Sequence, residues 1–215
     1  MGLENLANQR QNLTYGRIEA EVFAHCGEYE TEEEVFKLIE DHIEIIKSYN
    51  RNFDLVPNFG VYFLDDLTLS PGVMLDRATL AAKECKGNYI DTVGVFKPEM
   101  SIRLEKEQEI VNEMVQALAD EQFIVYLQPK YSLETNAPAG AEALVRWMHP
   151  KKGMVSPGLF IPVFEKNGFI ERLDHYVWEV ICKYLRKWID EGLKPHPISV
   201  NISRVDLYNP QIVEF

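Results

Sequence analysis

The chain has 215 residues, of which 46% are hydrophobic and 26% charged, so it has enough apolar content for one large domain or two smaller ones. Its formal net charge of -12 at pH 7 excludes the broad basic face with which a protein binds a DNA or RNA polymer. It has neither a signal-peptide pattern at its start nor an apolar run long enough for a membrane segment, so we expect a cytoplasmic protein.

Short strands alternate with helices over the first hundred residues. Thr31 and Glu34 form the sequence pattern of a capping box at the start of one helix. Ser70 and Pro71 have the residue types of an N-cap and a first helical position at the start of another. This order predicts an α+β fold, with helices on one face of an antiparallel sheet. The elements are expected at residues 16–26 (hairpin), 31–50 (helix), 59–66 (strand), 70–85 (helix) and 89–96 (strand).

A longer helix is predicted at residues 99–122. Apolar residues from Ile110 to Leu118 recur at helical spacing, and the charged stretch before them is typical of a solvated face. We expect this helix to act as a linker into a second domain.

The second part begins with a predicted pair of strands around the turn-forming sequence ETNAPAG. In a strand, Glu142 and Arg146 project from one face, while Ala143 and Trp147 project from the other. Glu142 and Arg146 are then about 13 Å apart at about 3.3 Å per residue, too far for a close ion pair. This favours a site at Glu142, although a buried carboxylate paired with a neighbouring strand stays an alternative.

Two helices, predicted at residues 156–168 and 171–192, precede a further predicted strand at 196–203. Asn201 falls near the C-terminal end of that strand. Strand, helix and strand in this order are typical of an α/β fold of the β/α-barrel type, whose chemistry lies at the C-terminal ends of the strands.

Four linked stretches resemble the first half of an EAL domain, the cyclic di-GMP phosphodiesterase domain. They are YLQP, EALVRW, SPGLFIPVFEKNGFI and SVNIS, in this order over about ninety residues. The resemblance implies a TIM-like barrel with an antiparallel first strand pair. It implies that Glu142 and Asn201 are catalytic metal ligands, and that Gln128 and Arg146 contact the phosphate region of cyclic di-GMP.

The same resemblance implies Mg²⁺ or Mn²⁺ as cofactor, two-metal hydrolysis of cyclic di-GMP to linear pGpG, and a homodimer formed through the EAL domain. Hard oxygen ligands suit these ions, and a guanidinium suits phosphate oxygens. Residues 123–215 hold only about three of eight barrel strands, so we expect a fragment that is inactive by itself. The alternative is a non-catalytic cyclic di-GMP receptor or a protein-interaction module.

Residues 1–98 more weakly resemble a GGDEF domain, the diguanylate cyclase domain, without its N-terminal part. The match rests on RIEAEVFA at residues 17–24 and on LDRATLAAKECKGNY. A side chain where the family has glycine would crowd and repel a nucleotide, and valine cannot ligate a metal. We therefore do not expect a diguanylate cyclase. The degenerate motif is Glu19 and Ala20 in place of two glycines, Glu21 with an acidic side chain retained, Val22 in place of an acidic residue, and Phe23.

Overall fold

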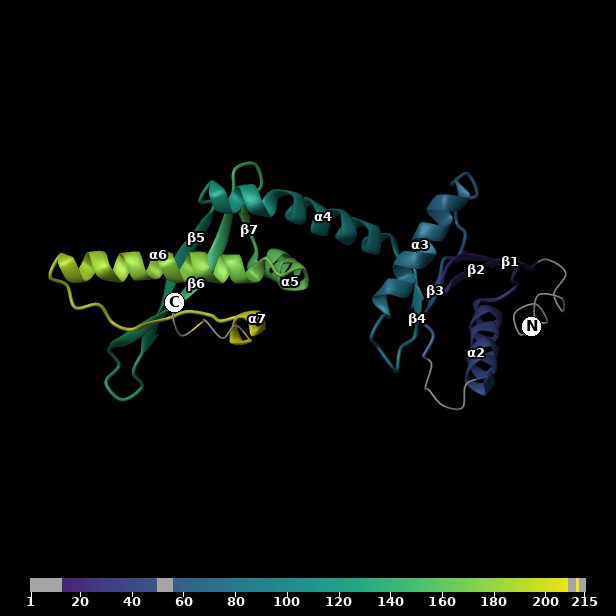
Figure 1. Cartoon of the computed structure of the whole chain (residues 1–215), viewed down its shortest axis with the longest axis horizontal. Coiled ribbons are helices and arrows are strands. Elements are labelled where there is room, and N and C mark those ends of the chain that lie inside the picture. Colours follow the sequence, from purple (N-terminus) through teal and green to yellow (C-terminus); the bar gives the residue numbers. More distant parts are fainter. Residues whose placement is uncertain (1–12, 50–55, 209–211, 213–215) are drawn as a thin grey trace. The chain divides into compact units, whose positions relative to one another are not determined.

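The computed structural model describes residues 13–49, 56–208 and 212 (Figure 1). The chain divides into two compact units, Met1–Ile102 and Arg103–Phe215. Both units mix helices with strands, as the sequence predicts. Among the described helices, none is long and apolar enough to cross a membrane.

A hairpin of strands β1 (Leu13–Glu19) and β2 (Val22–Gly27) begins the described part of the first unit. The strands are antiparallel, and Glu19 lies opposite Val22 across a two-residue connection. The hairpin predicted at residues 16–26 is confirmed.

Helix α2 (Glu32–Tyr49) begins with a modified capping box. The Thr31 hydroxyl accepts a hydrogen bond from the Glu34 amide at 3.4 Å. The Glu34 carboxylate accepts from the Glu30 amide at 3.0 Å, one residue before the partner that the sequence pattern predicts. The two bonds still satisfy backbone donors at the helix start, where acidic side chains are electrostatically favourable.

Strands β3 (Phe59–Val61) and β4 (Val93–Val95) are parallel, and helix α3 (Pro71–Glu84) lies between them in the chain. The prediction of an antiparallel sheet is therefore wrong for this pair, although it holds for the hairpin. The reason is the connection: a helix of 14 residues returns the chain to the end where β3 began, so β4 runs in the same direction. The predicted N-cap is confirmed, because the Ser70 hydroxyl accepts from the Val73 amide at 3.4 Å.

Two glycines let α3 lie directly against this strand pair. A Cβ added at Gly60 would lie 1.8 Å from the Ala78 carbonyl oxygen, and one at Gly94 would lie 2.2 Å from the Ala81 carbonyl oxygen. Both obstacles are helix backbone, which cannot rotate away as a side chain can. Only glycine fits these two positions.

Gly60→Ala should destabilise the first unit by at least about 2 kcal/mol, because the added methyl group overlaps the backbone of α3. Gly72→Ala is the matched control: its Cβ would meet only the Ser70 hydroxyl, at 3.8 Å, and alanine is the better helix former. Hydrogen exchange measured by mass spectrometry on peptides from β3 and α3 should show faster exchange for Gly60→Ala only. Equal protection in the two variants would contradict the packing.

The division between the two units falls within helix α4 (Pro98–Ala119). From Arg103 onward α4 is part of the second unit, where the side chains of Ile110 and Ala117 are buried in the hydrophobic core. A helix is thus present in the range 99–122, where the apolar spacing predicts one. Its role as a linker stays a prediction, as do the domain boundaries.

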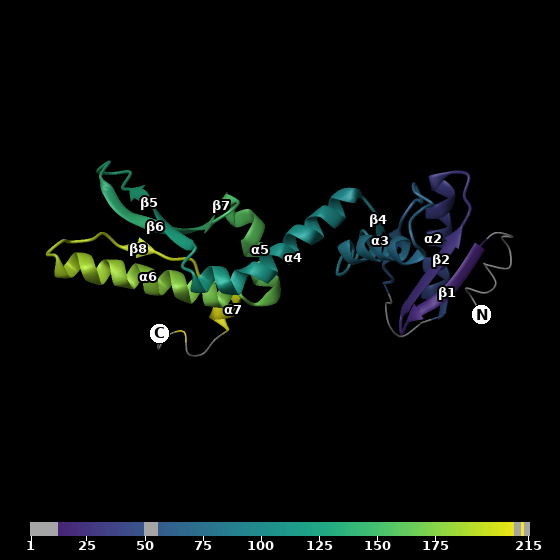
Figure 2. The ribbon, with the colours of Figure 1, turned by 90° about the horizontal axis from the view of Figure 1, so that it is seen from above.

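The sheet of the second unit is built around β6 (Pro138–His149). Strand β5 (Phe123–Tyr131) pairs antiparallel with β6 over most of its length. Two short strands also pair with β6, β7 (Gly153–Val155) in the antiparallel and β8 (Ile198–Ser199) in the parallel direction. The antiparallel pair predicted from the sequence is confirmed, whereas closure into a barrel stays a prediction. The remaining elements are α5 (Pro157–Asn167), α6 (Ile170–Asp190) and α7 (Arg204–Leu207), and Figure 2 shows α6 running alongside the β5–β6 sheet.

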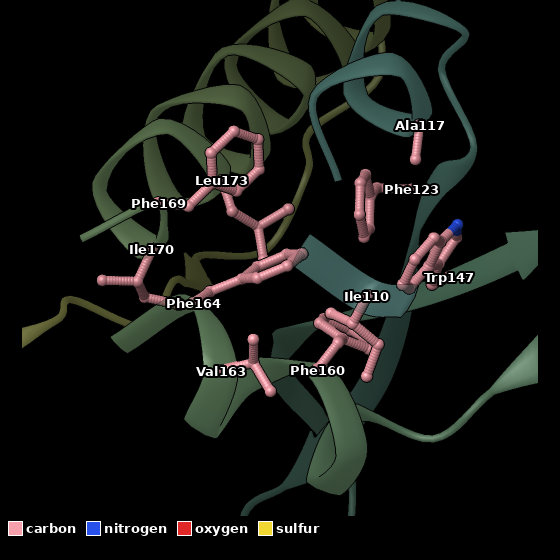
Figure 3. Close-up of a cluster of buried hydrophobic side chains, with 10 residues drawn as sticks. All are labelled: Ile110, Ala117, Phe123, Trp147, Phe160, Val163, Phe164, Phe169, Ile170 and Leu173. Atoms are coloured by element: carbon pink, nitrogen blue, oxygen red, sulfur yellow. The ribbon is translucent and has the colours of Figure 1, made fainter. Parts of the chain in front are cut away.

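An aromatic cluster forms the main core of the second unit (Figure 3). The centroid of the Phe123 ring lies 5.3 Å from that of Trp147 and 5.6 Å from that of Phe160. The Trp147 and Phe160 rings meet edge to face. Phe123 and Trp147 are adjacent on paired strands, while Phe160 comes from α5. The core therefore joins the sheet to the helices. It buries Ala143 and Trp147, which share one face of β6 as the alternation predicts.

Phe160→Ala should lower the free energy of unfolding of the second unit by about 3–5 kcal/mol, because the ring is fully buried. Leu159→Ala is the control on the same helix. Because Leu159 is 55% exposed, this substitution should lower the free energy of unfolding by less than about 1 kcal/mol. Tryptophan fluorescence during urea unfolding reports this unit alone, because Trp147, Trp178 and Trp188 all belong to it. Similar losses in both variants would contradict the assigned core.

Candidate functional site

Three strands bring Glu142 next to two other polar residues. Glu142 on β6 pairs with Gln128 on β5 and with Ser199 on β8. Because paired residues of neighbouring strands project from the same face, the three side chains form a row across the sheet. The structure thus brings together the predicted residues Gln128 and Glu142.

Lys130 joins this row. Its ammonium group lies 3.8 Å from the Glu142 carboxylate and donates a hydrogen bond to the Ser199 hydroxyl at 2.6 Å. Neither Lys130 nor Ser199 is among the site residues predicted from the sequence. The signal for Lys130 was available, because it follows Gln128 by two residues and so shares its face in a strand. Ser199 has no such signal, because its place depends on the pairing of β8 with β6.

Gly140 allows β8 to come this close. A Cβ at Gly140 would lie 2.9 Å from the Pro197 carbonyl oxygen, and the Ala141 amide donates to that same oxygen at 3.0 Å. Because Gly140 has no side chain, the Pro197 carbonyl can accept this hydrogen bond from Ala141. The bond lies one residue before the pairing of Glu142 with Ser199.

Arg146 lies on the same face of β6 as Glu142 but farther along the strand, by about 13 Å at about 3.3 Å per residue. Its guanidinium group donates to the Val145 carbonyl at 2.8 Å and lies 6.0 Å from the centroid of the Tyr126 ring. Within the described residues Glu142 and Arg146 form no ion pair, in agreement with the strand spacing. A ligand that contacts both must extend along β6.

Asn201 follows β8 instead of lying within it. The strand predicted at residues 196–203 is reduced to two residues, because the backbone beyond it bonds to side chains of α6 and not to a neighbouring strand. The Asn201 carbonyl accepts from the Trp178 indole at 3.0 Å, and the Ser203 amide donates to the Asp174 carboxylate at 3.0 Å. Helix α6 thereby holds the segment that carries Asn201.

Two buried carboxyl groups support this segment. Asp174 is 8% exposed and Asp206 is fully buried. Burial, together with the neighbouring Asp206 carboxyl group, raises the pKa of Asp174 to about 7. The contact between α6 and the segment after β8 therefore includes polar groups that are almost fully buried.

In the first unit, the residues predicted to be a degenerate cyclase motif form the tip of the β1–β2 hairpin, and the tip carries its own internal contacts. Arg17 donates from Nε to the Ala20 carbonyl at 2.9 Å, and its guanidinium group lies 5.8 Å from the centroid of the Phe23 ring. A positive side chain near a hairpin suits a phosphate ligand, but here it is engaged by the turn. The motif residues are Glu19, Ala20, Glu21, Val22 and Phe23.

The predicted metal ligands have suitable chemistry for Mg²⁺ or Mn²⁺. Glu142 offers a carboxylate and Asn201 a carboxamide oxygen, and both are hard donors. Lys130 places a positive charge beside the same carboxylate, so a metal ion that binds Glu142 competes with the Lys130 ammonium group. Mg²⁺ takes six ligands, so water, a bound phosphate or further residues must supply the others.

Most of the second unit is similar to a known protein family. Residues 111–215 match the family model described as "EAL domain". This part of the chain is therefore similar to EAL domains, in agreement with the resemblance of its four linked stretches.

The curated relatives include two proteins of Pseudomonas aeruginosa. The chain is 31% identical to "Bifunctional diguanylate cyclase/cyclic di-GMP phosphodiesterase MucR" over 119 residues, which are 55% of this chain and 17% of that protein. It is 31% identical to "Cyclic di-GMP phosphodiesterase NbdA" over 141 residues, which are 66% of this chain and 18% of that protein. The chain thus spans less than a fifth of the length of these two relatives. A solved structure, "PaMucR Phosphodiesterase, c-di-GMP complex", is 33% identical, with 49% of this chain and 43% of that chain covered and a TM-score of 0.46.

Glu142→Gln should change the free energy of unfolding of the second unit by less than about 1 kcal/mol. The Glu142 side chain is 36% exposed, and among the described residues its ion pair is with the half-exposed Lys130; such pairs contribute little to stability. Urea unfolding followed by tryptophan fluorescence measures the effect, with Lys130→Met as the matched variant of the partner. A loss above about 2 kcal/mol would identify Glu142 as a structural carboxylate.

Proposed function

We propose that residues 123–215 are the N-terminal part of a cyclic di-GMP phosphodiesterase domain, which hydrolyses its substrate to linear pGpG in a polypeptide that completes the barrel. The observation that carries this proposal is the polar row of Gln128, Lys130 and Glu142 on an open face of EAL-domain sequence. The two relatives named as phosphodiesterases support it.

In this proposal Glu142 and Asn201 hold a Mg²⁺ or Mn²⁺ ion as oxygen ligands. Such an ion neutralises charge on the phosphodiester and lowers the pKa of a bound water, which supplies hydroxide. Gln128 donates a hydrogen bond to a phosphate oxygen, and the Arg146 guanidinium pairs with the phosphate region farther along β6. Lys130, once released from Glu142, offers a second positive charge to the phosphate.

The residues of this sequence by themselves should bind metal weakly and not turn the substrate over. Glu142 and Asn201 supply two oxygen ligands, and the carboxylate already faces an ammonium group. Two-metal hydrolysis needs more carboxylates than this row contains. The first unit is proposed to be structural or regulatory and not a diguanylate cyclase, because Glu19 and Ala20 replace the glycines that let a nucleotide approach and Val22 cannot ligate a metal.

A receptor that binds cyclic di-GMP without hydrolysing it is the second candidate. The contact between Lys130 and Glu142 favours it, since a carboxylate that keeps a lysine partner need not take up a metal ion. Binding of the nucleotide requires only the phosphate contacts of Gln128, Lys130 and Arg146.

Glu142→Gln should reduce hydrolysis of cyclic di-GMP at least about 100-fold in a polypeptide with the complete domain, because it removes a charged metal ligand but keeps the side-chain volume. Two controls should retain activity: Glu134→Gln in the exposed β5–β6 turn, and Glu21→Gln in the hairpin of the first unit. The measurement is chromatographic quantification of pGpG in the presence of Mg²⁺ or Mn²⁺.

Unchanged turnover in Glu142→Gln would show that the metal assignment is wrong. Saturable binding of the nucleotide by the unsubstituted protein, with no metal-dependent release of pGpG, would replace the phosphodiesterase with the receptor.

A further inference from the structure

A second group of metal-binding side chains lies away from the polar row on β6. Glu171 and His175 are four residues apart, so they share a face in the first turns of α6. Asp206 comes from α7, which lies beside this end of α6 in Figures 1 and 2. One ligand atom from each of the three residues lies within 4.8 Å of the others.

The Asp206 carboxylate is buried with one oxygen unsatisfied. Its Oδ2 accepts a hydrogen bond from the Ser203 hydroxyl at 2.5 Å. Within the described residues its Oδ1 is buried and accepts no hydrogen bond, and it lies 3.4 Å from Nε2 of His175. A buried carboxylate oxygen that accepts no hydrogen bond is costly, so this position calls for a positive charge, either on a protonated His175 or on a bound cation.

Two other carboxyl groups lie near this oxygen. The Asp174 carboxyl group is also buried and accepts a hydrogen bond from the Ser203 amide, and Glu171 adds a further carboxylate beside that of Asp206. A divalent cation balances such a group of carboxylates, whereas a protonated imidazole supplies only one charge.

We propose that Glu171, Nε2 of His175 and Oδ1 of Asp206 bind one divalent transition-metal ion, of which Zn²⁺ is the representative. One imidazole and two carboxylates are a donor set that suits Zn²⁺. Two ligands of a tetrahedral Zn²⁺ with bonds of about 2.1 Å lie about 3.4 Å apart, which equals the separation of His175 Nε2 and Asp206 Oδ1. The Glu171 side chain is only partly buried, and its carboxylate lies within 4.8 Å of the other two ligand atoms.

The bound ion joins α6 to α7. Ser203 caps the start of α7, and the Asn201 carbonyl accepts from Trp178 on α6. Coordination of one ion by both His175 and Asp206 therefore stabilises the packing of the whole segment from Asn201 to Leu207 on α6. This site has a structural role and does not depend on the proposed phosphodiesterase activity.

The test is a Zn²⁺ titration of the 215-residue chain after removal of metal by a chelator, followed by isothermal calorimetry. We expect a saturable site of one ion per chain that His175→Gln and Glu171→Gln each weaken at least about 10-fold. Both positions are partly exposed on α6, so the variants should keep the fold, and far-UV circular dichroism checks this. The matched controls are Glu179→Gln on the same helix and His196→Gln, both exposed, which should bind with unchanged affinity.

Two further variants test whether Zn²⁺ binds elsewhere on the chain. Cys26→Ser removes an exposed thiol of the first unit, and Glu142→Gln removes the metal ligand of the proposed catalytic row. Neither should weaken the site. The Trp178 ring lies 4.9 Å from the His175 ring, so Co²⁺ used in place of Zn²⁺ should quench tryptophan fluorescence in the unsubstituted chain and much less in His175→Gln.

Absence of saturable binding, or equal affinity in the unsubstituted chain and in His175→Gln, would overturn the proposal. The cluster would then be a carboxyl pair of Asp174 and Asp206 that shares a proton beside an imidazole. Loss of binding in Glu142→Gln alone would overturn it as well, and would place the metal on β6.

Discussion

Backbone pairing along β6 is the interaction on which the rest of the second unit depends. This strand bonds to β5, β7 and β8, so it determines where residues from distant parts of the chain meet. The burial of Ala143 and Trp147 holds one face of β6 inward, and a shift by one residue would exchange the two faces. The hydrophobic core thereby sets the register that places Glu142 beside Gln128.

Helix α6 makes the second contribution. Its apolar side packs into the core through residues such as Leu173, while its polar contacts hold the chain after β8. Asp174 binds the Ser203 amide and Trp178 binds the Asn201 carbonyl. The position of Asn201 therefore follows from helix packing and not from strand pairing alone. Packing in the core and polar contacts at its edge act together to place the proposed metal ligand.

Much of this architecture is predictable from local sequence patterns. The alternation along residues 123–131 and 141–148 predicts the paired strands and which residues share a face, because side-chain direction in a strand has a period of two. Ser70 predicts a helix start, because its hydroxyl satisfies a free backbone amide. The parallel pairing of β3 and β4 was missed, since strand direction depends on where the intervening helix returns the chain.

The candidate site is less completely predictable. Glu142, Gln128 and Asn201 are found through the resemblance, but the contacts of Lys130 with Ser199 require the pairing of β8 with β6. That pairing depends on the absence of a side chain at Gly140, which no periodicity reveals. The cluster around Asp206 is equally hard to predict from the sequence, because α6 and α7 approach each other only in the folded unit.

The measurement that tests the phosphodiesterase site most directly is anomalous diffraction from Mn²⁺-soaked crystals of a polypeptide that contains these residues and a complete EAL domain. The account predicts an anomalous peak about 2.1 Å from a Glu142 carboxylate oxygen, with Lys130 displaced from that carboxylate. A well-ordered Glu142 that remains with Lys130, with Mn²⁺ bound elsewhere or not at all, would contradict it.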